Sequence, residues 1–224
     1  MAQEKSPKRV TIYGRLSFPN FEHGPAVARN AKSKFPKPAD EVQPDFNLLV
    51  EQAQLDKLVN HVTGEFLPYC LDQSNKGEKR DALSKKNLDR IVKLINGADW
   101  ENQPPYLPIK PVGDKTAALA PEAVASIKVV GNKGTDIELK AIVNDESELV
   151  VPDPDILQFP VIKPIGQTVH QMYGGCYVVA TLNLYAYETG SVGFSAAASV
   201  AVFKADGDRF GGGVAVDEDE IFLD

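Results

Sequence analysis

The chain has 224 residues, a formal net charge of -7 at neutral pH and 43% hydrophobic residues, enough apolar material for one large domain or two small ones. No apolar run reaches the about 18 residues that cross a membrane, and the charged start "MAQEKSPKRV" lacks the apolar stretch of a secretory signal. These features speak against a transmembrane helix and favour a cytoplasmic protein without a membrane partner.

The charges are distributed unevenly along the chain. Residues 1–100 hold 16 Lys and Arg against 13 Asp and Glu, whereas residues 214–224 hold five acids and no Lys or Arg. No acid interrupts the segment from His23 to Ala39, which surrounds Phe35 with cations. These cations are Arg29, Lys32, Lys34 and Lys37. Such polarity favours a polyanionic partner more than the bulk charge suggests.

The first strand is predicted in "RVTIYGRLS". Apolar side chains such as Ile12 alternate there with Tyr13 and Arg15, so one face is apolar and the other carries aromatic and cationic groups. Residues 19–45 are rich in Pro, Lys, Ala and Asn, and we expect a long basic loop rather than a regular element. A second strand is predicted in "DFNLLVEQ".

Two helices are predicted next. Leucine and valine residues recur every three or four positions in "AQLDKLVNHVTGEF", the pattern of an amphipathic helix. A second helix begins after Ser84, a good N-cap, and ends at Gly97. We expect the two helices to be neighbours, and the proline-punctuated residues 98–121 to contain no long element.

From residue 125 onward the chain is predicted to be β. "SIKVVG" and "TDIELKAIV" predict two strands joined by a hairpin turn at "NKG", the second with Ile137, Leu139, Ala141 and Val143 facing inward. "YVVATLNLYAY" predicts the strongest strand, with Tyr185 on the face opposite its apolar one, and "SAAASVAVFKADGDRFGGG" predicts its partner. This order of elements predicts a β-barrel or sandwich with helical insertions.

The aromatic strand faces and the basic loop together suit single-stranded nucleic acid, because bases stack on aromatic rings while cations follow the phosphates. Tyrosines are also good strand formers that can cover a second core, and a charged loop can simply be solvated. The residues alone leave both interpretations open.

No catalytic, metal or cofactor site is expected. "GFSAAAS" departs from a nucleophile elbow at Ala197, and "GNKGTD" lacks the lysine of a phosphate-binding loop. The three histidines have no partner at a spacing that binds metal. Cys70 and Cys176 lie far apart without a paired motif, so we expect two ordinary buried thiols.

Two stretches carry a resemblance to a known family. At "RVTIYGRLSFPNFEHG" and "YGGCYVVATLNLYAYETGSVGFSAAASVAVFKADGDRFGGG", together with the acidic end, the sequence resembles phage-encoded single-stranded DNA-binding replication proteins. That family has an Arg-Leu-Ser strand followed by an aromatic-rich loop, then a Tyr-x-Gly-Cys-Tyr strand and an Asp-Gly-x-Arg-Phe-Gly-Gly stretch. The last two match Tyr173 to Tyr187 and Asp206 to Gly213.

The resemblance implies an OB-fold, a five-stranded antiparallel β-barrel, over residues 1–213 with a helical insertion at about 51–97. It implies sequence-independent binding of single-stranded DNA in phage replication or recombination, in the host cell cytoplasm, by a monomer or a dimer. Cations would hold phosphates and aromatic rings would stack on bases. The expected cations are Arg15, Arg29, Lys32, Lys34 and Lys37, and the expected rings are Tyr13, Phe18, Phe35 and Tyr185.

Residues 214–224 are then expected to form a flexible acidic tail that contacts phage or host replication proteins and competes with DNA. Its expected contact residues are Asp217, Glu218, Asp219, Glu220, Ile221 and Phe222. Related bacterial tails end on phenylalanine, whereas here Leu223 and Asp224 follow Phe222.

Two other functions fit parts of the sequence. A nucleotide-metabolising enzyme similar to dUTP pyrophosphatases could fold the glycine-rich end over a nucleotide, although no Ser/Gly motif for the phosphates is present. A β-sandwich virion or assembly protein would instead bury its tyrosine face against another subunit.

Overall fold

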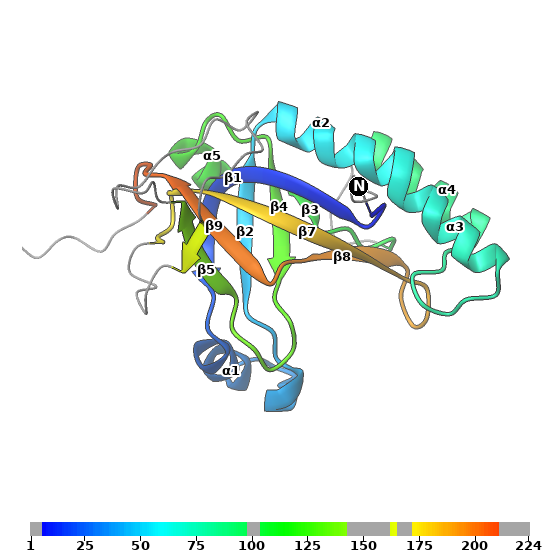
Figure 1. Ribbon diagram of the computed structural model, residues 1–224, viewed down its shortest axis with the longest axis horizontal. Helices are drawn as coiled ribbons and strands as arrows, with labels where there is room; N and C mark the ends of the chain where they lie inside the picture. Colours follow the sequence, from blue (N-terminus) through cyan, green and yellow to red (C-terminus); the bar gives the residue numbers. More distant parts are fainter. Residues whose placement is uncertain (1–5, 98–103, 143–161, 165–171, 211–224) are drawn as a thin grey trace, which may run out of the picture.

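The structure, a computed structural model, describes residues 6–97, 104–142, 162–164 and 172–210 (Figure 1). The strands within these ranges are β1 (Arg9–Asn20), β2 (Asp45–Val50), β3 (Ile109–Pro111), β4 (Ala125–Val130), β5 (Glu138–Ile142), β6 (Ile162–Pro164), β7 (Tyr177–Tyr187), β8 (Gly193–Ala197) and β9 (Val200–Ala205). The α-helices are α1 (His23–Ala31), α2 (Gln52–His61), α3 (Leu67–Asn75), α4 (Lys85–Asn96) and α5 (Asp114–Leu119). A 3-10 turn (Ala39–Glu41) precedes β2, and a π-helical turn (Val62–Phe66) joins α2 to α3.

Five of the described strands close into a barrel. The neighbours run β1–β2–β4–β8–β7, and β7 pairs with β1 to complete the ring. Every pair in the ring is antiparallel except β4 with β8, which is parallel. A small closed five-stranded barrel is the OB-fold architecture, so the predicted fold class is confirmed, with one parallel pair in place of a fully antiparallel ring. β3 and the β9–β5–β6 extension widen the sheet beyond the ring.

The barrel closes because β1 pairs with two strands. Residues from Arg9 to Arg15 pair with β7, and residues from Arg15 to Asn20 pair with β2. Gly14 lies just before the change of partner, where the chains approach so closely that a Cβ atom would stand 2.5 Å from the carbonyl oxygen of Leu49. Only glycine fits this contact without a shift of the backbone.

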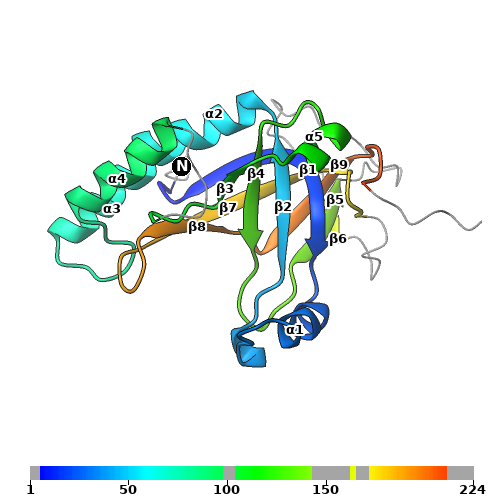
Figure 2. The same cartoon turned by 180° about the vertical axis from the view of Figure 1, so that it is seen from behind.

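The core lies inside the barrel and beneath the helices. Inward-facing residues of the strands are buried, and α2, α3 and α4 add their apolar faces along one side of the sheet (Figures 1 and 2). Phe66 packs its ring edge against Phe194 of β8, with 5.8 Å between the centroids. This contact ties the helical layer to the barrel. None of the described helices is long and apolar enough to span a membrane.

Most predicted elements are confirmed. The strands predicted along the chain form as β1, β2, β4, β5 and β7. The helix predicted over residues 53–66 is α2 with the π-helical turn, and the second predicted helix is α4. The contact with α4 comes from α3, which continues the first helical segment. The last predicted strand is β8 followed by β9, which together pair antiparallel with one edge of β7 around a break at 198–199. Residues 98–121 hold only the short β3 and α5 within their described part.

Two sequence predictions are wrong. Residues 19–45 are not all loop, since α1 forms there; its first N–H donates to the carboxylate of Asp136 at 2.7 Å, a cap that lies 113 residues away. β4 and β5 do not form a hairpin at "NKG", because β2, β3 and β8 occupy both edges of β4 while β5 pairs with β9 and β6. Ile137 is buried as predicted, and Val143 lies outside the described residues.

The contact at Gly14 predicts a large effect of a single methyl group. We expect Gly14→Ala to lower the free energy of unfolding by about 1–3 kcal/mol, the usual cost of forcing extra volume into a packed site. Urea denaturation of the full chain measures this. The control is Gly64→Ala in the π-helical turn, where a Cβ meets nothing within 4 Å and stability should stay level or rise. Equal effects of the two substitutions would contradict the role of Gly14.

Candidate functional site

An open groove of about 440 Å³ lies on the outer face of β2 and β4. In Figure 2 these strands run between α5 at one end and α1 at the other. The groove is lined by residues of β1, α1, β2, β4 and the segment from β3 to α5. Those lining residues that carry polar or charged side chains are Ser17, Arg29, Asp45, Asn47, Lys110, Thr116, Ser126 and Lys128.

The strand register explains why these side chains share a face. Asn47 pairs with Lys128, and Ser126 pairs with Lys110 on its other side. Alternate residues of a strand point to opposite faces, so the intervening Leu48 and Ile127 are fully buried in the core. The polar members therefore form one continuous outer surface across three strands.

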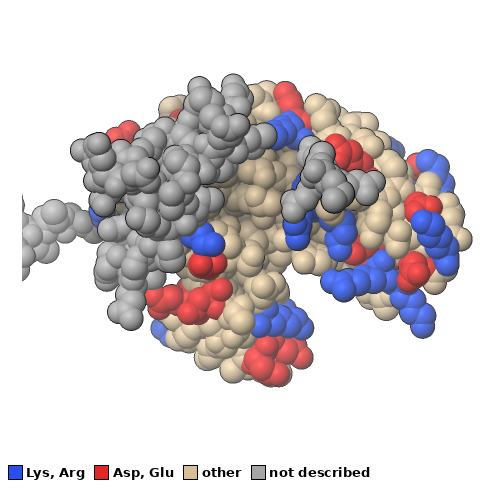
Figure 3. All heavy atoms as spheres, in the orientation of Figure 1, with Lys and Arg blue, Asp and Glu red and all other residues tan. Residues whose placement is uncertain are grey.

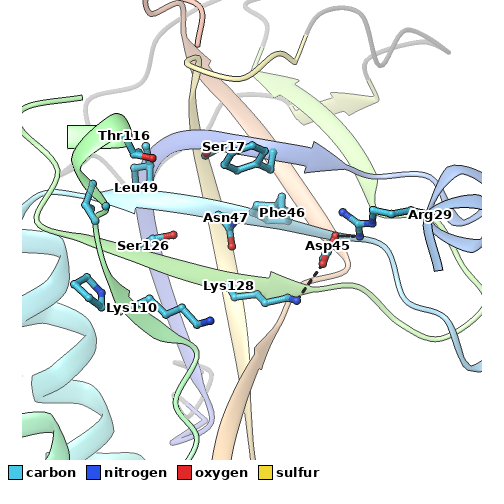
Figure 4. A pocket seen from close by; sticks show the side chains of 14 residues that line it. Ser17, Arg29, Asp45, Phe46, Asn47, Leu49, Lys110, Thr116, Ser126 and Lys128 are labelled. Atoms are coloured by element: carbon cyan, nitrogen blue, oxygen red, sulfur yellow. Dashed lines mark hydrogen bonds and ion pairs between the residues drawn. The ribbon is translucent and has the colours of Figure 1, made fainter. Parts of the chain in front are cut away.

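Three cations and one acid set the charge of the groove (Figure 4). Arg29 reaches from α1 and Lys128 from β4 to the carboxylate of Asp45, the lysine at 3.3 Å. Lys110 is exposed at the other end of the groove. The lining residues thus carry a net positive charge, which favours an anionic ligand.

Phe18 stands at the edge of the groove in a strained conformation. Its φ angle is +48°, a left-handed value that is uncommon for residues other than glycine, and the pairing of β1 with β2 shifts register between Ser17 and Asn20. Its side chain is 73% exposed although it is a large apolar ring. Strain and exposure in one residue are typical of a functional position.

The predicted basic segment lies beside this groove. A second hollow of about 320 Å³, lined by Lys37 among others, shares Arg29, Asp45 and Lys128 with the groove. Lys32, Lys34, Phe35 and Lys37 are all exposed, and Phe35 has 80% of its surface free with the Lys34 ammonium 5.6 Å from its ring centroid. Asn30 holds the segment through two hydrogen bonds with the backbone of Lys37.

Arg15 has a different place from the one expected of a phosphate ligand. Its side chain is 6% exposed, and its guanidinium donates to the carbonyl oxygens of Gly175, Leu119 and Asp208 and to the carboxylate of Glu122. The rings of Tyr177 and Phe210 lie 5.6 and 4.4 Å from it. Arg15 therefore joins three segments of the chain to β1, and it does not line the groove.

Tyr13 and Tyr185 lie on another surface, the outer face of β1 and β7. Tyr13 pairs across the sheet with Val179 and has the Lys204 ammonium 4.1 Å from its ring centroid, while Lys8 lies 4.7 Å from the ring of Tyr185. Figure 3 shows this side of the molecule, with charges of both signs interspersed toward α3 and α4. The predicted site residues therefore divide between two surfaces.

Sequence reasoning missed Lys110, Lys128, Asn47 and Ser126. The signal was present, since Lys128 interrupts the apolar residues of "SIKVVG" at an outward position. The tail residues Asp217, Glu218, Asp219, Glu220, Ile221 and Phe222 lie outside the described residues.

Both cysteines are free and buried as predicted. Burial raises the pKa of Cys70 to about 12 and that of Cys176 to about 11, so neither thiol ionises near neutral pH. No group of three or more His, Cys, Asp or Glu side chains that could hold a metal ion occurs in the described part of the chain.

Comparison with known proteins finds similarity in structure alone. Neither a protein-family model nor a curated protein matches the sequence. Two structures of the single-stranded DNA-binding protein from bacteriophage Enc34 match with a TM-score of 0.50. One is 15% identical, and the match covers 96% of this chain and 90% of that one. The other is a complex with single-stranded DNA; it is 14% identical, and the match covers 91% of this chain and 90% of that one. The gp2.5 protein of bacteriophage T7, also a single-stranded DNA-binding protein, matches at 13% identity over 97% of this chain and 95% of its own, with a TM-score of 0.39. The chain thus shares its fold with the Enc34 protein, a phage single-stranded DNA-binding protein, as the resemblance in sequence implied.

The environment of Arg15 predicts a structural role that can be measured. We expect Arg15→Lys to lower the free energy of unfolding by about 3 kcal/mol, because lysine keeps the buried charge but cannot reproduce the planar set of hydrogen bonds. Arg29→Lys is the matched control: its side chain is 56% exposed and its ion pair should contribute less than about 1 kcal/mol. Similar losses in both variants would contradict this assignment.

Proposed function

We propose that this chain is a non-enzymatic, sequence-independent single-stranded DNA-binding protein that serves phage DNA replication or recombination in the cytoplasm of the host cell. One observation carries the proposal: an OB barrel whose β2–β4 face holds a positively charged groove with an exposed, strained phenylalanine at its edge. The same face and the loop between the first two strands bind oligonucleotides in OB-folds generally. The Enc34 protein with the matching fold has been solved with single-stranded DNA.

The groove supplies both parts of such an interface. Arg29 and Lys128 lie together at one end of the groove and Lys110 at the other, where they can contact different phosphates of one strand, and Lys37 extends the cationic path into the second hollow. Phe18 and Phe35 offer open rings to unstacked bases. Since every base has an aromatic face and every nucleotide a phosphate, contacts of these two kinds favour single strands over duplexes without reading their sequence.

Binding of a fluorescent oligo-dT, followed by anisotropy at several salt concentrations, tests the proposal. The affinity should fall steeply with salt, because each phosphate contact releases a counterion, and should exceed the affinity for duplex DNA of the same length. Phe18→Ala should weaken binding by about 1–3 kcal/mol, the contribution of one stacked base, or roughly 5- to 150-fold.

Two controls accompany this measurement. The Phe18 side chain is largely exposed, so its removal should change the free energy of unfolding by less than about 0.5 kcal/mol. Phe18→Tyr keeps an aromatic ring and should retain binding. No binding of oligo-dT at low salt, or binding no tighter than that of duplex, would overturn the function, and full binding by Phe18→Ala would remove this residue from the interface.

The alternatives from the sequence have less support. A nucleotide-metabolising enzyme needs a catalytic acid that is free to activate a water molecule, whereas both oxygens of the acid in this groove, Asp45, are engaged by Arg29 and Lys128. Hydrolysis of a panel of deoxynucleoside triphosphates distinguishes that function. A virion protein was expected to have a β-sandwich, whereas the described strands close into a barrel.

The acidic residues 214–224 also belong to the proposal. We infer that they contact phage or host replication proteins and compete with DNA for the basic surface, because their charge is opposite to that of the groove. In this proposal residues 1–213 form the DNA-binding domain and residues 214–224 form a separate acidic tail.

Truncation after Gly213 tests this competition. The shortened chain should bind oligo-dT several-fold more tightly at low salt, because the tail no longer opposes the phosphates. The difference should shrink as salt screens the charges. Unchanged affinity at low salt would exclude competition by the tail and leave DNA binding itself unaffected.

A further inference from the structure

Asp45 lies at the junction of the two hollows. It lines both the groove on β2 and β4 and the second hollow beside the basic segment, and so do its partners Arg29 and Lys128. The three side chains come from β2, α1 and β4, and Figure 4 shows them converging at one end of the groove. A ligand that runs from one hollow into the other must pass this ion cluster.

The carboxylate of Asp45 divides its two oxygens between the two cations. Oδ1 pairs with the Arg29 guanidinium, and Oδ2 lies 3.3 Å from the Lys128 ammonium. The two cationic side chains are 56% and 55% exposed, whereas that of Asp45 is 17% exposed. The cations are therefore accessible from solvent while the acid lies beneath them.

This arrangement matches the chemistry of a phosphodiester, which also spreads one negative charge over two free oxygens and pairs well with arginine and lysine. We propose that the junction is a phosphate subsite of the DNA path. In the absence of DNA, the Asp45 carboxylate pairs with the two cations that would bind the phosphate. The inference rests on the proposed function and adds to it a residue that limits affinity.

Asp45 has two opposing effects on a bound phosphate. It orients Arg29 and Lys128, which favours binding, and its negative charge repels the phosphate at close range. Exposed ion pairs orient side chains only weakly, since much of their Coulomb energy is offset by side-chain entropy and solvent screening. The repulsion between the Asp45 carboxylate and a phosphate that binds the same two cations acts at close range. We therefore expect this repulsion to outweigh the gain from orienting Arg29 and Lys128.

Asp45→Asn in the full chain tests the subsite with oligo-dT as the probe. The amide keeps the size of the side chain and removes its charge. We expect binding about 3- to 10-fold tighter near 0.1 M salt, and a plot of log affinity against log salt that is steeper by about 0.7, the value for one more phosphate contact on a single strand. Asp45→Ser replaces this variant if the asparagine variant does not fold.

Two controls separate a local subsite from a change in net charge. Asp89→Asn on α4 removes the same charge from an exposed ion pair with Lys85, outside both hollows, and should change affinity less than twofold. In a Lys128→Gln background, Asp45→Asn should lose most of its gain, because one of the two cations is then missing.

The outcomes distinguish the two proposals. If the unmodified chain binds oligo-dT but Asp45→Asn binds equally or more weakly, the carboxylate is a positioning group and the subsite is overturned while the function stands. A gain no larger than that of Asp89→Asn also overturns it. If the unmodified chain does not bind oligo-dT at all, the proposed function fails and the subsite fails with it.

Discussion

The dual pairing of β1 is the constraint on which the rest of the structure depends. One strand must follow β7 over its first half and β2 over its second, and the close approach of Gly14 to the Leu49 carbonyl is where that change becomes possible. The barrel closes through this strand, so β2 and β4 are held beside each other as a rigid face. Beyond the change of partner, the irregular end of β1 turns Phe18 outward at the edge of that face.

A second constraint decides how much of the face stays open. The segment after β3 lies across the outer side of β1 and β2, where Ala120 and Ala123 pack on Leu49 and the carbonyl of Leu119 accepts a hydrogen bond from Arg15. Outward-facing residues under this cover are buried although they are on the outside of the barrel. The groove is bounded by this segment at the Leu49 end of β2 and runs along the strand to Asp45. Elements that are short and irregular thus determine the length of the candidate interface.

The sequence predicted the regular parts well and the covered parts poorly. Alternation of apolar and polar residues is a local property, so β1 and β7 could be predicted together with the face on which each side chain lies. It could not show that Arg15 would be covered, because the cover comes from about a hundred residues further along the chain. Local alternation also could not predict α1, whose first N–H donates to Asp136 far along the chain. Nor could it show that Lys128 lines the groove, since that depends on β4 lying beside β2.

Arg15 and Arg29 show that residue type alone does not define an interface of this kind. Both are arginines beside β2, Arg15 at its Leu49 end and Arg29 at its Asp45 end, and both pair with a carboxylate. Arg15 is buried with carbonyl oxygens on its nitrogens, so a phosphate could reach it only if those contacts broke. Arg29 is more than half exposed and shares its acid with a lysine. A cation that can exchange one anion for another needs this second arrangement, in which the resident anion is a side chain and the outer half of the cation remains in water.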